Sequence, residues 1–285
     1  MSSMTSYAIR RLKDRLAFSL CLLCVAIAIV PLGSILLEVT GNGISALSVE
    51  FLTHPPGAVG QGGGGVANAI QGTLILIGLT CLIGVPLGVM SGIFLAEFGD
   101  SEFGAAIRFL NEVLMQFPSI VVGIFVYLLV VLALGSFSAI AGAVALSIIM
   151  MPIVARTTEE SLKLVPNSIR EAAMALGVRR WRTTMSVVLS TAKSGIVTGI
   201  MLSIARISGE TAPLIMTILG SQWFFAGFKQ PMDALPLRVW RLALLPYDYA
   251  HQQGWGAALV LILLVLVLNV IVRLATRRRY RSRAR

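Results

Sequence analysis

The sequence predicts an all-α protein that crosses a membrane six times. Of its 285 residues, 56% are hydrophobic and 13% are charged, whereas soluble domains have about 25% charged residues. The net charge of +10 is gathered at the ends of long uncharged runs. That distribution is typical of the cytoplasmic segments of membrane proteins and argues against a nucleic-acid-binding surface. The composition therefore favours a polytopic membrane protein over a soluble enzyme.

The first two predicted crossings are 16–37 and 70–95. The uncharged run 16–37 would extend about 33 Å as a helix, enough to span a bilayer. The basic segment before it, 1–15, resembles the start of a signal peptide, but the apolar run is too long for one. We interpret 1–15 as a cytoplasmic tail and 16–37 as a retained helix. The second crossing contains Pro86, where we expect a kink.

The uncharged run 113–155 is long enough for the third and fourth crossings. As one helix it would extend roughly 65 Å, about twice the thickness of a bilayer core. Gly135 and Ser136 are the natural turn between the two crossings, and Pro118 and Pro152 are the expected outer limits.

The last two predicted crossings are 195–219 and 256–272. They complete a predicted core of five helices at 70–272, which is followed by a basic tail at 273–285. Six crossings and two basic ends predict that both termini are cytoplasmic.

The same rule assigns the connecting segments. The basic loop 156–193 is predicted to be cytoplasmic, and 38–69 and 220–255 are predicted to be external. The segment 97–112 is an exception, because it is cytoplasmic in this topology but carries an acidic excess. Acidic residues contribute little to the rule, so the topology stands.

No constellation for catalysis or metal binding is evident. The glycine-rich stretch 60–65 lacks the Lys-Ser/Thr of a phosphate-binding loop. Cys21 and Cys24 lie in an apolar run, where the thiolate needed for redox or metal chemistry is disfavoured. Neither His54 nor His251 has a nucleophile or carboxylate at a recognisable spacing. We expect no cofactor in this chain.

The loop 156–193 has the pattern of a docking element. Small or apolar residues recur at helical spacing, at Ile169, Ala172, Ala173 and Leu176. Gly177 then offers the positive φ that ends a helix at little cost. One interpretation is a docking surface for a partner, and the other is a helix lying on anionic lipid. A likeness to a DNA-binding helix-turn-helix is discounted, because so short a loop is tethered to the membrane at both ends.

A charged pair lies within the predicted crossing 195–219. A charge at that depth costs several kcal/mol unless it is paired or hydrated. Arg206 and Glu210 are four residues apart and therefore share a helical face, with the hydroxyls of Ser208 and Thr211 nearby. The pair either fixes helix packing or lines an anion pathway, in which arginine donates two parallel hydrogen bonds to an oxyanion.

Two motifs resemble a known family. Glu171-Ala172-Ala173, Gly177 and the aliphatic pair Val187 and Leu189 resemble the signature loop of permease subunits in binding-protein-dependent ABC importers. Ser190 stands where that loop usually has proline, so we expect its helix to continue. The run from Ala205 to Leu214, with 68–73 and 118–121, resembles the permeases of phosphate importers.

The resemblance implies a type I importer permease in a prokaryotic inner membrane. It implies a homologous sister permease, a cytoplasmic ATPase dimer that binds ATP and Mg²⁺, and an external phosphate-binding protein. The ATPase contact is implied at Glu171, Ala172, Ala173 and Gly177. The chain itself has no Walker motif and is expected not to be an enzyme.

Three other functions are compatible with the sequence. One is a permease for another tetrahedral oxyanion, such as sulfate or molybdate. Another is a secondary carrier coupled to protons through Glu210, although such carriers usually have two related halves and no repeat is visible here. The third is a membrane-anchored adaptor in which the charged pair is only structural.

Overall fold

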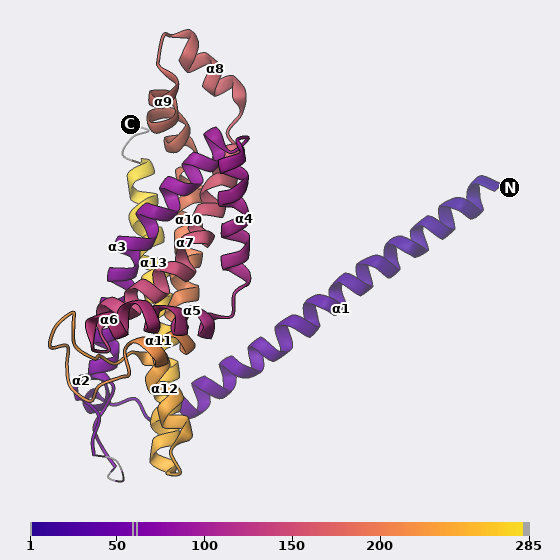
Figure 1. The fold of residues 1–285 in the computed structure, drawn as a ribbon. Helices are drawn as coiled ribbons and strands as arrows, with labels where there is room; N and C mark the ends of the chain where they lie inside the picture. Colours follow the sequence, from indigo (N-terminus) through magenta and orange to yellow (C-terminus); the bar gives the residue numbers. More distant parts are fainter. Residues whose placement is uncertain (1, 59, 61, 282–285) are drawn as a thin grey trace.

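The computed structural model describes residues 2–58, 60 and 62–281, with side chains from 10 to 274, and it is built of helices (Figure 1). The α-helices are α1 Ser2–Ile44, α2 Val49–Thr53, α3 Ala67–Phe98, α4 Glu102–Gln116, α5 Ser119–Val126, α6 Leu132–Leu134, α7 Ala139–Lys163, α8 Asn167–Ala175, α9 Arg180–Arg182, α10 Leu189–Ser208, α11 Ala212–Thr217, α12 Leu235–Leu244 and α13 Asp248–Arg281. Two π-helical turns, Tyr127–Val131 and Thr183–Val188, join α5 to α6 and α9 to α10. The predicted all-α class is confirmed.

Five stretches of the described residues are long and apolar enough to cross a membrane. They are Arg10–Ile44, Ala67–Phe98, Ala139–Lys163, Arg180–Ser208 and Asp248–Leu274. A bent pair of helices supplies a sixth crossing if it is counted as one span. The helices extend beyond the predicted apolar runs at several ends, where charged residues continue the helix.

The third crossing differs from its prediction. It begins at Glu102 instead of Val113, and the chain bends by 105° between α4 and the segment Ser119–Leu134. Pro118 causes this break, because its ring disfavours the helical conformation at Phe117, which has φ −65° and ψ 133°. The predicted turn after this segment is present: Gly135 ends α6 with φ +67°.

The fifth crossing is also interrupted. The prediction was one run at 195–219, but α10 ends at Ser208 and α11 begins at Ala212. Hydropathy alone could not show this, because the residues on both sides of the break are apolar. At the other end, the helix runs through Ser190 without a break, as the absence of a proline there predicted.

Helix α7 forms the centre of the bundle, packed against both α3 and α10. On α3, Gly88 and Gly92 lie against α7. A Cβ atom at Gly92 would lie 2.5 Å from the Ala155 carbonyl oxygen and 2.5 Å from the Thr158 Cβ. Small residues permit this approach of helix backbones in membranes. Helices α3 and α7 therefore form one closely packed unit.

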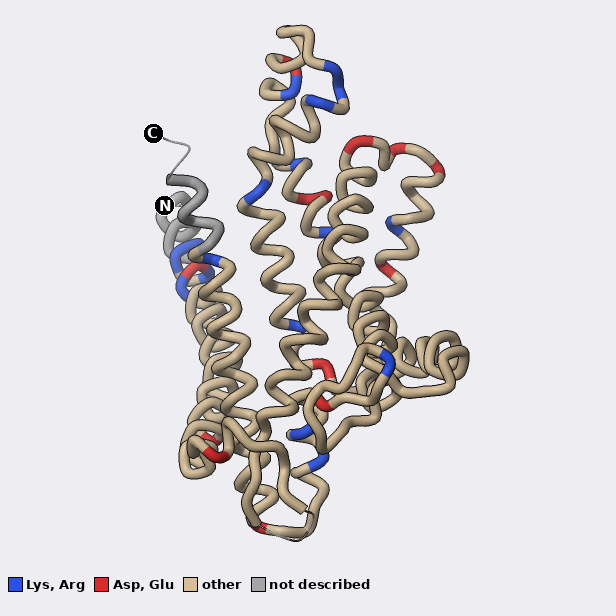
Figure 2. Tube along the Cα trace, turned by 90° about the vertical axis from the view of Figure 1, so that its left-hand side faces the viewer, with Lys and Arg blue, Asp and Glu red and all other residues tan. Residues whose placement is uncertain are grey.

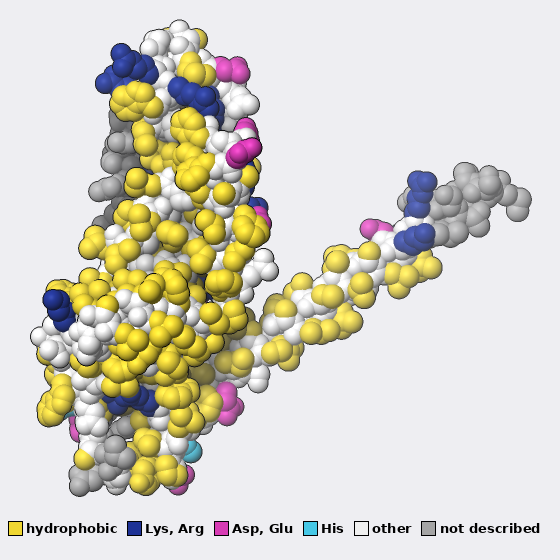
Figure 3. All heavy atoms as spheres, in the orientation of Figure 1, with side chains coloured by type: hydrophobic (Ala, Val, Ile, Leu, Met, Phe, Trp, Pro, Cys, Tyr) yellow, Lys and Arg dark blue, Asp and Glu magenta, His cyan; other side chains and the backbone are white. Residues whose placement is uncertain are grey.

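Helix α1 leaves this bundle. It packs against α13 near its C-terminal end, where Gly43 approaches Trp255 and Leu259, and diverges from the other helices toward its N-terminus (Figure 1). Its most apolar stretch has no buried residue, and hydrophobic side chains cover its visible face (Figure 3). This helix therefore depends on surroundings outside its own chain.

The segment before α12, which was predicted to be external, is tied to α3 by buried polar groups. Asp233 forms an ion pair with Arg238, and both side chains are almost completely buried. Arg238 donates to the Ser221 carbonyl oxygen at 3.0 Å, and the Leu235 N–H donates to the Thr73 hydroxyl at 2.8 Å. Polar groups buried this far from water require such partners. The sequence pattern did not predict these buried contacts.

Candidate transport pathway and docking loop

Arg206 and Glu210 lie at the break in the fifth crossing. Arg206 is in the last turn of α10, and Glu210 follows in the connection to α11. The Arg206 Nε and the Glu210 Oε1 are 3.6 Å apart, which is an ion pair but too long for a hydrogen bond. The cationic side chain is also placed favourably at the C-terminal, negative end of the helix dipole.

The two members of the pair differ in exposure. The Arg206 side chain is 51% exposed in the chain and that of Glu210 is 17% exposed. Among the residues that the structure describes, the Arg206 side chain makes an ion pair with Glu210 but donates no hydrogen bond. Its planar set of donors is therefore free to bind an oxyanion in a bidentate manner. Glu210 holds the guanidinium near the break.

The two neighbouring hydroxyls are placed differently. Ser208 is buried and donates its proton to the Ile204 carbonyl oxygen at 2.6 Å, so that proton stays within the helix. Thr211 is half-buried at the start of α11. The structure thus places Arg206, Glu210 and Thr211 at the helix break, with Ser208 turned into its own helix.

The predicted docking loop lies beyond one end of the bundle, where α8 and α9 project from α7 and α10 (Figure 1). Gly177 ends the first helix with φ +82°. The Val178 N–H donates to the Ala173 carbonyl oxygen at 3.3 Å and the Gly177 N–H to that of Met174 at 2.9 Å. This pair of bonds is a Schellman motif, which satisfies the final carbonyls of the helix. The predicted glycine stop is confirmed.

The small face predicted for α8 is divided between two sides. Ala173 is buried and Ile169 is half-buried against a cluster that includes Leu162 and Val188. Ala172 is exposed, and Leu176 is 84% exposed. The inner side therefore holds the loop to the bundle. The outer side leaves an apolar surface uncovered, with Glu171 exposed beside it.

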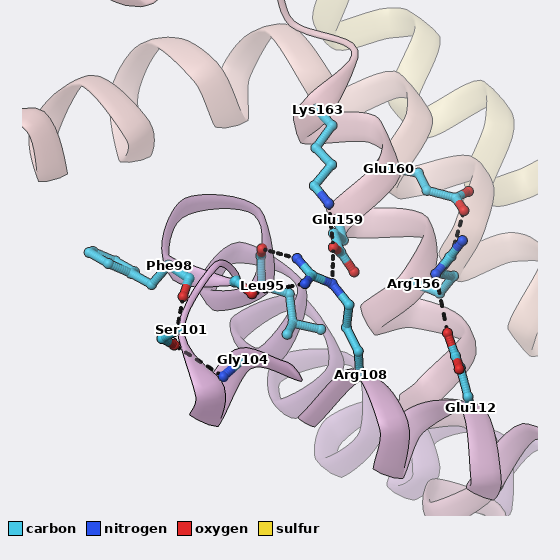
Figure 4. Close-up of polar contacts among 11 residues, drawn as sticks. Leu95, Phe98, Ser101, Gly104, Arg108, Glu112, Arg156, Glu159, Glu160 and Lys163 are labelled. Atoms are coloured by element: carbon cyan, nitrogen blue, oxygen red, sulfur yellow. Dashed lines mark hydrogen bonds and ion pairs between the residues drawn. The ribbon is translucent and has the colours of Figure 1, made fainter. Parts of the chain in front are cut away.

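Charged contacts that the sequence did not reveal hold the base of this loop. Glu97, at the end of α3, forms ion pairs with Arg170 and Arg180. Nearby, Arg108 on α4 donates its Nε proton to Glu159 on α7 at 2.9 Å (Figure 4). Charged residues of both signs gather toward this end of the bundle (Figure 2). The acidic excess of 97–112 was the available signal, since acidic residues there face a basic loop.

Known transport proteins resemble this chain over most of its length. The model of the family described as "Binding-protein-dependent transport system inner membrane component" matches residues 84–282. A phosphate transport system permease protein PstA of Yersinia pestis is 42% identical over 266 residues, covering 93% of this chain and 90% of the relative. A probable PstA of Methanocaldococcus jannaschii is 37% identical over 276 residues, covering 96% of this chain and 98% of the relative.

Solved structures share the fold. A chain of a bacterial alginate ABC transporter, in complex with a periplasmic protein bound to an alginate pentasaccharide, superposes with a TM-score of 0.68 at 13% identity, covering 93% of this chain and 95% of that one. A chain of the inward-facing MetNI methionine ABC transporter gives a TM-score of 0.56 at 17% identity, covering 76% and 93%. The chain therefore belongs to the family of binding-protein-dependent transport system inner membrane components and, within it, to the PstA permeases.

Proposed function

We propose that this chain forms part of the anion pathway of an ATP-driven importer of inorganic phosphate. The observation that carries the proposal is the half-exposed Arg206 guanidinium, which lies at a break in a membrane-spanning helix and donates no hydrogen bond to the described residues. A charge in that position requires a counter-ion or water, and a tetrahedral oxyanion matches the planar donor set. The name of the relatives supports phosphate as that anion.

The proposed complex contains four kinds of subunit. A PstC-type sister permease supplies a second half of the pathway, because one guanidinium per chain is too little charge for a dianion. A PstB-type ATPase dimer holds the ATP and Mg²⁺, and a PstS-type external protein delivers phosphate. The assembled complex is then a translocase of the prokaryotic inner membrane, and this chain is a subunit without an ATPase site. Both termini face the cytoplasm.

Coupling in this proposal begins at the outer side of α8. The exposed Ala172 and Leu176 contact the ATPase, and Gly177 maintains the turn that presents them. The chain continues from this turn through Thr183–Val188 into α10, which ends beside Arg206. Closure of the ATPases therefore displaces the helix that carries the guanidinium, and the pathway opens alternately to the two sides of the membrane.

Vesicles that contain the purified complex test this function. We expect phosphate uptake that requires internal ATP, and ATP hydrolysis that increases when the phosphate-loaded binding protein is added outside. Stimulation by sulfate or molybdate in place of phosphate would indicate another oxyanion. Uptake driven by a proton gradient without ATP would indicate the secondary carrier, and binding without uptake would indicate an adaptor.

Replacing Gly177 with valine is expected to uncouple hydrolysis from uptake. A left-handed backbone costs a residue with a Cβ about 1–2 kcal/mol, and more for a β-branched one. A Cβ at this position meets nothing within 4 Å, so the change distorts the turn without a clash. Gly78→Val, at an open helical position in α3, is the matched control. An unchanged ratio of phosphate imported to ATP hydrolysed would show that the turn has no docking role.

A further inference from the structure

The end of helix α3 contacts both sides of the docking turn. The Glu97 side chain is 5% exposed, and its carboxylate forms ion pairs with Arg170 before the turn and with Arg180 after it. The second pair has its Nε and Oε2 atoms 3.7 Å apart. One buried carboxylate thus holds the two arms of the α8–α9 loop, which are separated in sequence by the Gly177 turn.

Hydrogen bonds to the backbone strengthen this connection. Arg170 donates to the Leu162 carbonyl oxygen at 2.9 Å, and Arg180 donates to the Glu97 carbonyl oxygen at 3.1 Å. The Arg180 guanidinium also lies over the ring of Phe98, 5.6 Å from its centre. Both arginines therefore bind the last residues of α3 or the adjoining end of α7, and their positions are set by two kinds of contact.

The same end of α3 is fixed to the rest of the bundle. Arg108 donates to the carbonyl oxygens of Leu95 and Gly99 at 3.1 and 2.8 Å, and to Glu159 on α7 at 2.9 Å (Figure 4). Lys163 completes the cluster with a bond to Glu159 at 2.7 Å. A displacement that reaches Glu97 is therefore passed to α3, α4 and α7 together.

Apolar packing also joins the loop to α3, because Ile169 of α8 packs against a cluster that Ile93 and Ala96 of α3 also contact. Helix α8 packs against the turn Thr183–Val188, and a pocket of about 430 Å³ separates part of it from the end of α3. Ala96, Glu97, Arg170, Glu171 and Arg180 are among the residues that line this pocket. Glu97, Arg170 and Arg180 line this open pocket, so their ion pairs add an electrostatic connection to the apolar one between the loop and α3.

We propose that Glu97 is a positioning residue that makes the docking loop move as one body with α3 and α7. This inference rests on the proposed function, because it assumes that an ATPase displaces the loop. When glutamine replaces Glu97, Arg170 and Arg180 lose their shared carboxylate. Helix α8 then moves against Thr183–Val188 without carrying α3. Hydrolysis then continues, while its effect on the membrane helices is reduced.

A distance measurement tests the inference independently of the transported anion. Spin labels are attached at Ala175 on α8 and Met90 on α3, both exposed, in a full complex whose three native cysteines are replaced by serine. The wild-type distance distribution is expected to stay narrow with and without ATP. In Glu97→Gln it is expected to broaden, and the ratio of phosphate imported to ATP hydrolysed is expected to fall about tenfold. A distribution as narrow as that of the wild type would overturn the proposal.

Two further variants complete the experiment. Glu112→Gln is the matched control, because that carboxylate lies in the same segment and its pair with Arg156 is exposed, with atoms 4.0 Å apart. It is expected to behave as the wild type. If Glu97→Gln does not assemble, Glu97→Gln with Arg170→Gln removes one of the unpaired charges and is measured instead, under the same criterion. If the wild type fails to take up phosphate but the label distances still broaden in Glu97→Gln, the proposed function is contradicted and the positioning role of Glu97 is supported.

Discussion

Replacing Arg206 with glutamine is expected to abolish phosphate uptake while the complex still assembles. The substitution removes the charge from a half-exposed side chain and leaves its neighbours in place. Charge-assisted hydrogen bonds contribute about 1.5–3 kcal/mol each, so the loss of two lowers anion affinity by about 100-fold or more. Initial rates of labelled phosphate uptake in vesicles measure the effect, and size-exclusion chromatography measures assembly.

Arg156→Gln is the matched control for this result. Arg156 also pairs with a glutamate four residues later, Glu160, and is similarly exposed, but it lies in the C-terminal half of α7, away from the break in the fifth crossing. Exposed pairs of this kind contribute about 0–1 kcal/mol, so uptake by the control should stay near that of the wild type. Normal uptake by Arg206→Gln would reject the anion-pathway interpretation. Loss of assembly in that variant would instead favour a structural ion pair.

Replacing Gly92 with leucine is expected to prevent formation of a stable bundle. The first atom added would lie 2.5 Å from a backbone oxygen of α7, and backbone cannot move aside as a flexible side chain can. Overpacking costs about 1–3 kcal/mol and occasionally more, which is a large part of the stability of a typical protein. The yield of monodisperse protein and its thermal unfolding in detergent measure this effect.

Gly78→Leu provides the comparison on the same helix. Gly78 has nothing within 4 Å of an added Cβ and is exposed, so the same change in volume there enters lipid or detergent. Its yield and thermal stability should match those of the wild type. Equal stability of Gly92→Leu and Gly78→Leu would show that the α3–α7 contact is looser than its geometry indicates.

The sequence predicted those parts of the fold that depend on local pattern. Uncharged runs located the crossings, and single glycines located the ends of α6 and α8, because φ > 0 at Gly135 and Gly177 is a local property. Helix α4 was missed because its charged residues, such as Arg108, made this part of the sequence resemble a connecting loop. In the structure this charge is satisfied by Glu159, which is 51 residues away in sequence.

The candidate site was predicted to a similar extent. The spacing of Arg206 and Glu210 predicted their proximity, and the structure places them 3.6 Å apart. The break between α10 and α11 depends on tertiary packing, although Gly209 and Pro213 were local signals of it. The ion pairs of Glu97 with Arg170 and Arg180 join segments more than 70 residues apart, and no periodicity in one sequence could match those partners.

The detachment of α1 has a consequence for how the polypeptide is made. This helix is synthesised before the other described helices, and its most apolar stretch has no residue buried by the rest of the chain, so it can partition into lipid before the bundle forms. Its link to the bundle is with α13, which follows all the other described helices in the sequence. The contact between α1 and α13 therefore forms late in biogenesis. Until then, α1 holds the nascent protein in the bilayer without packing against the bundle.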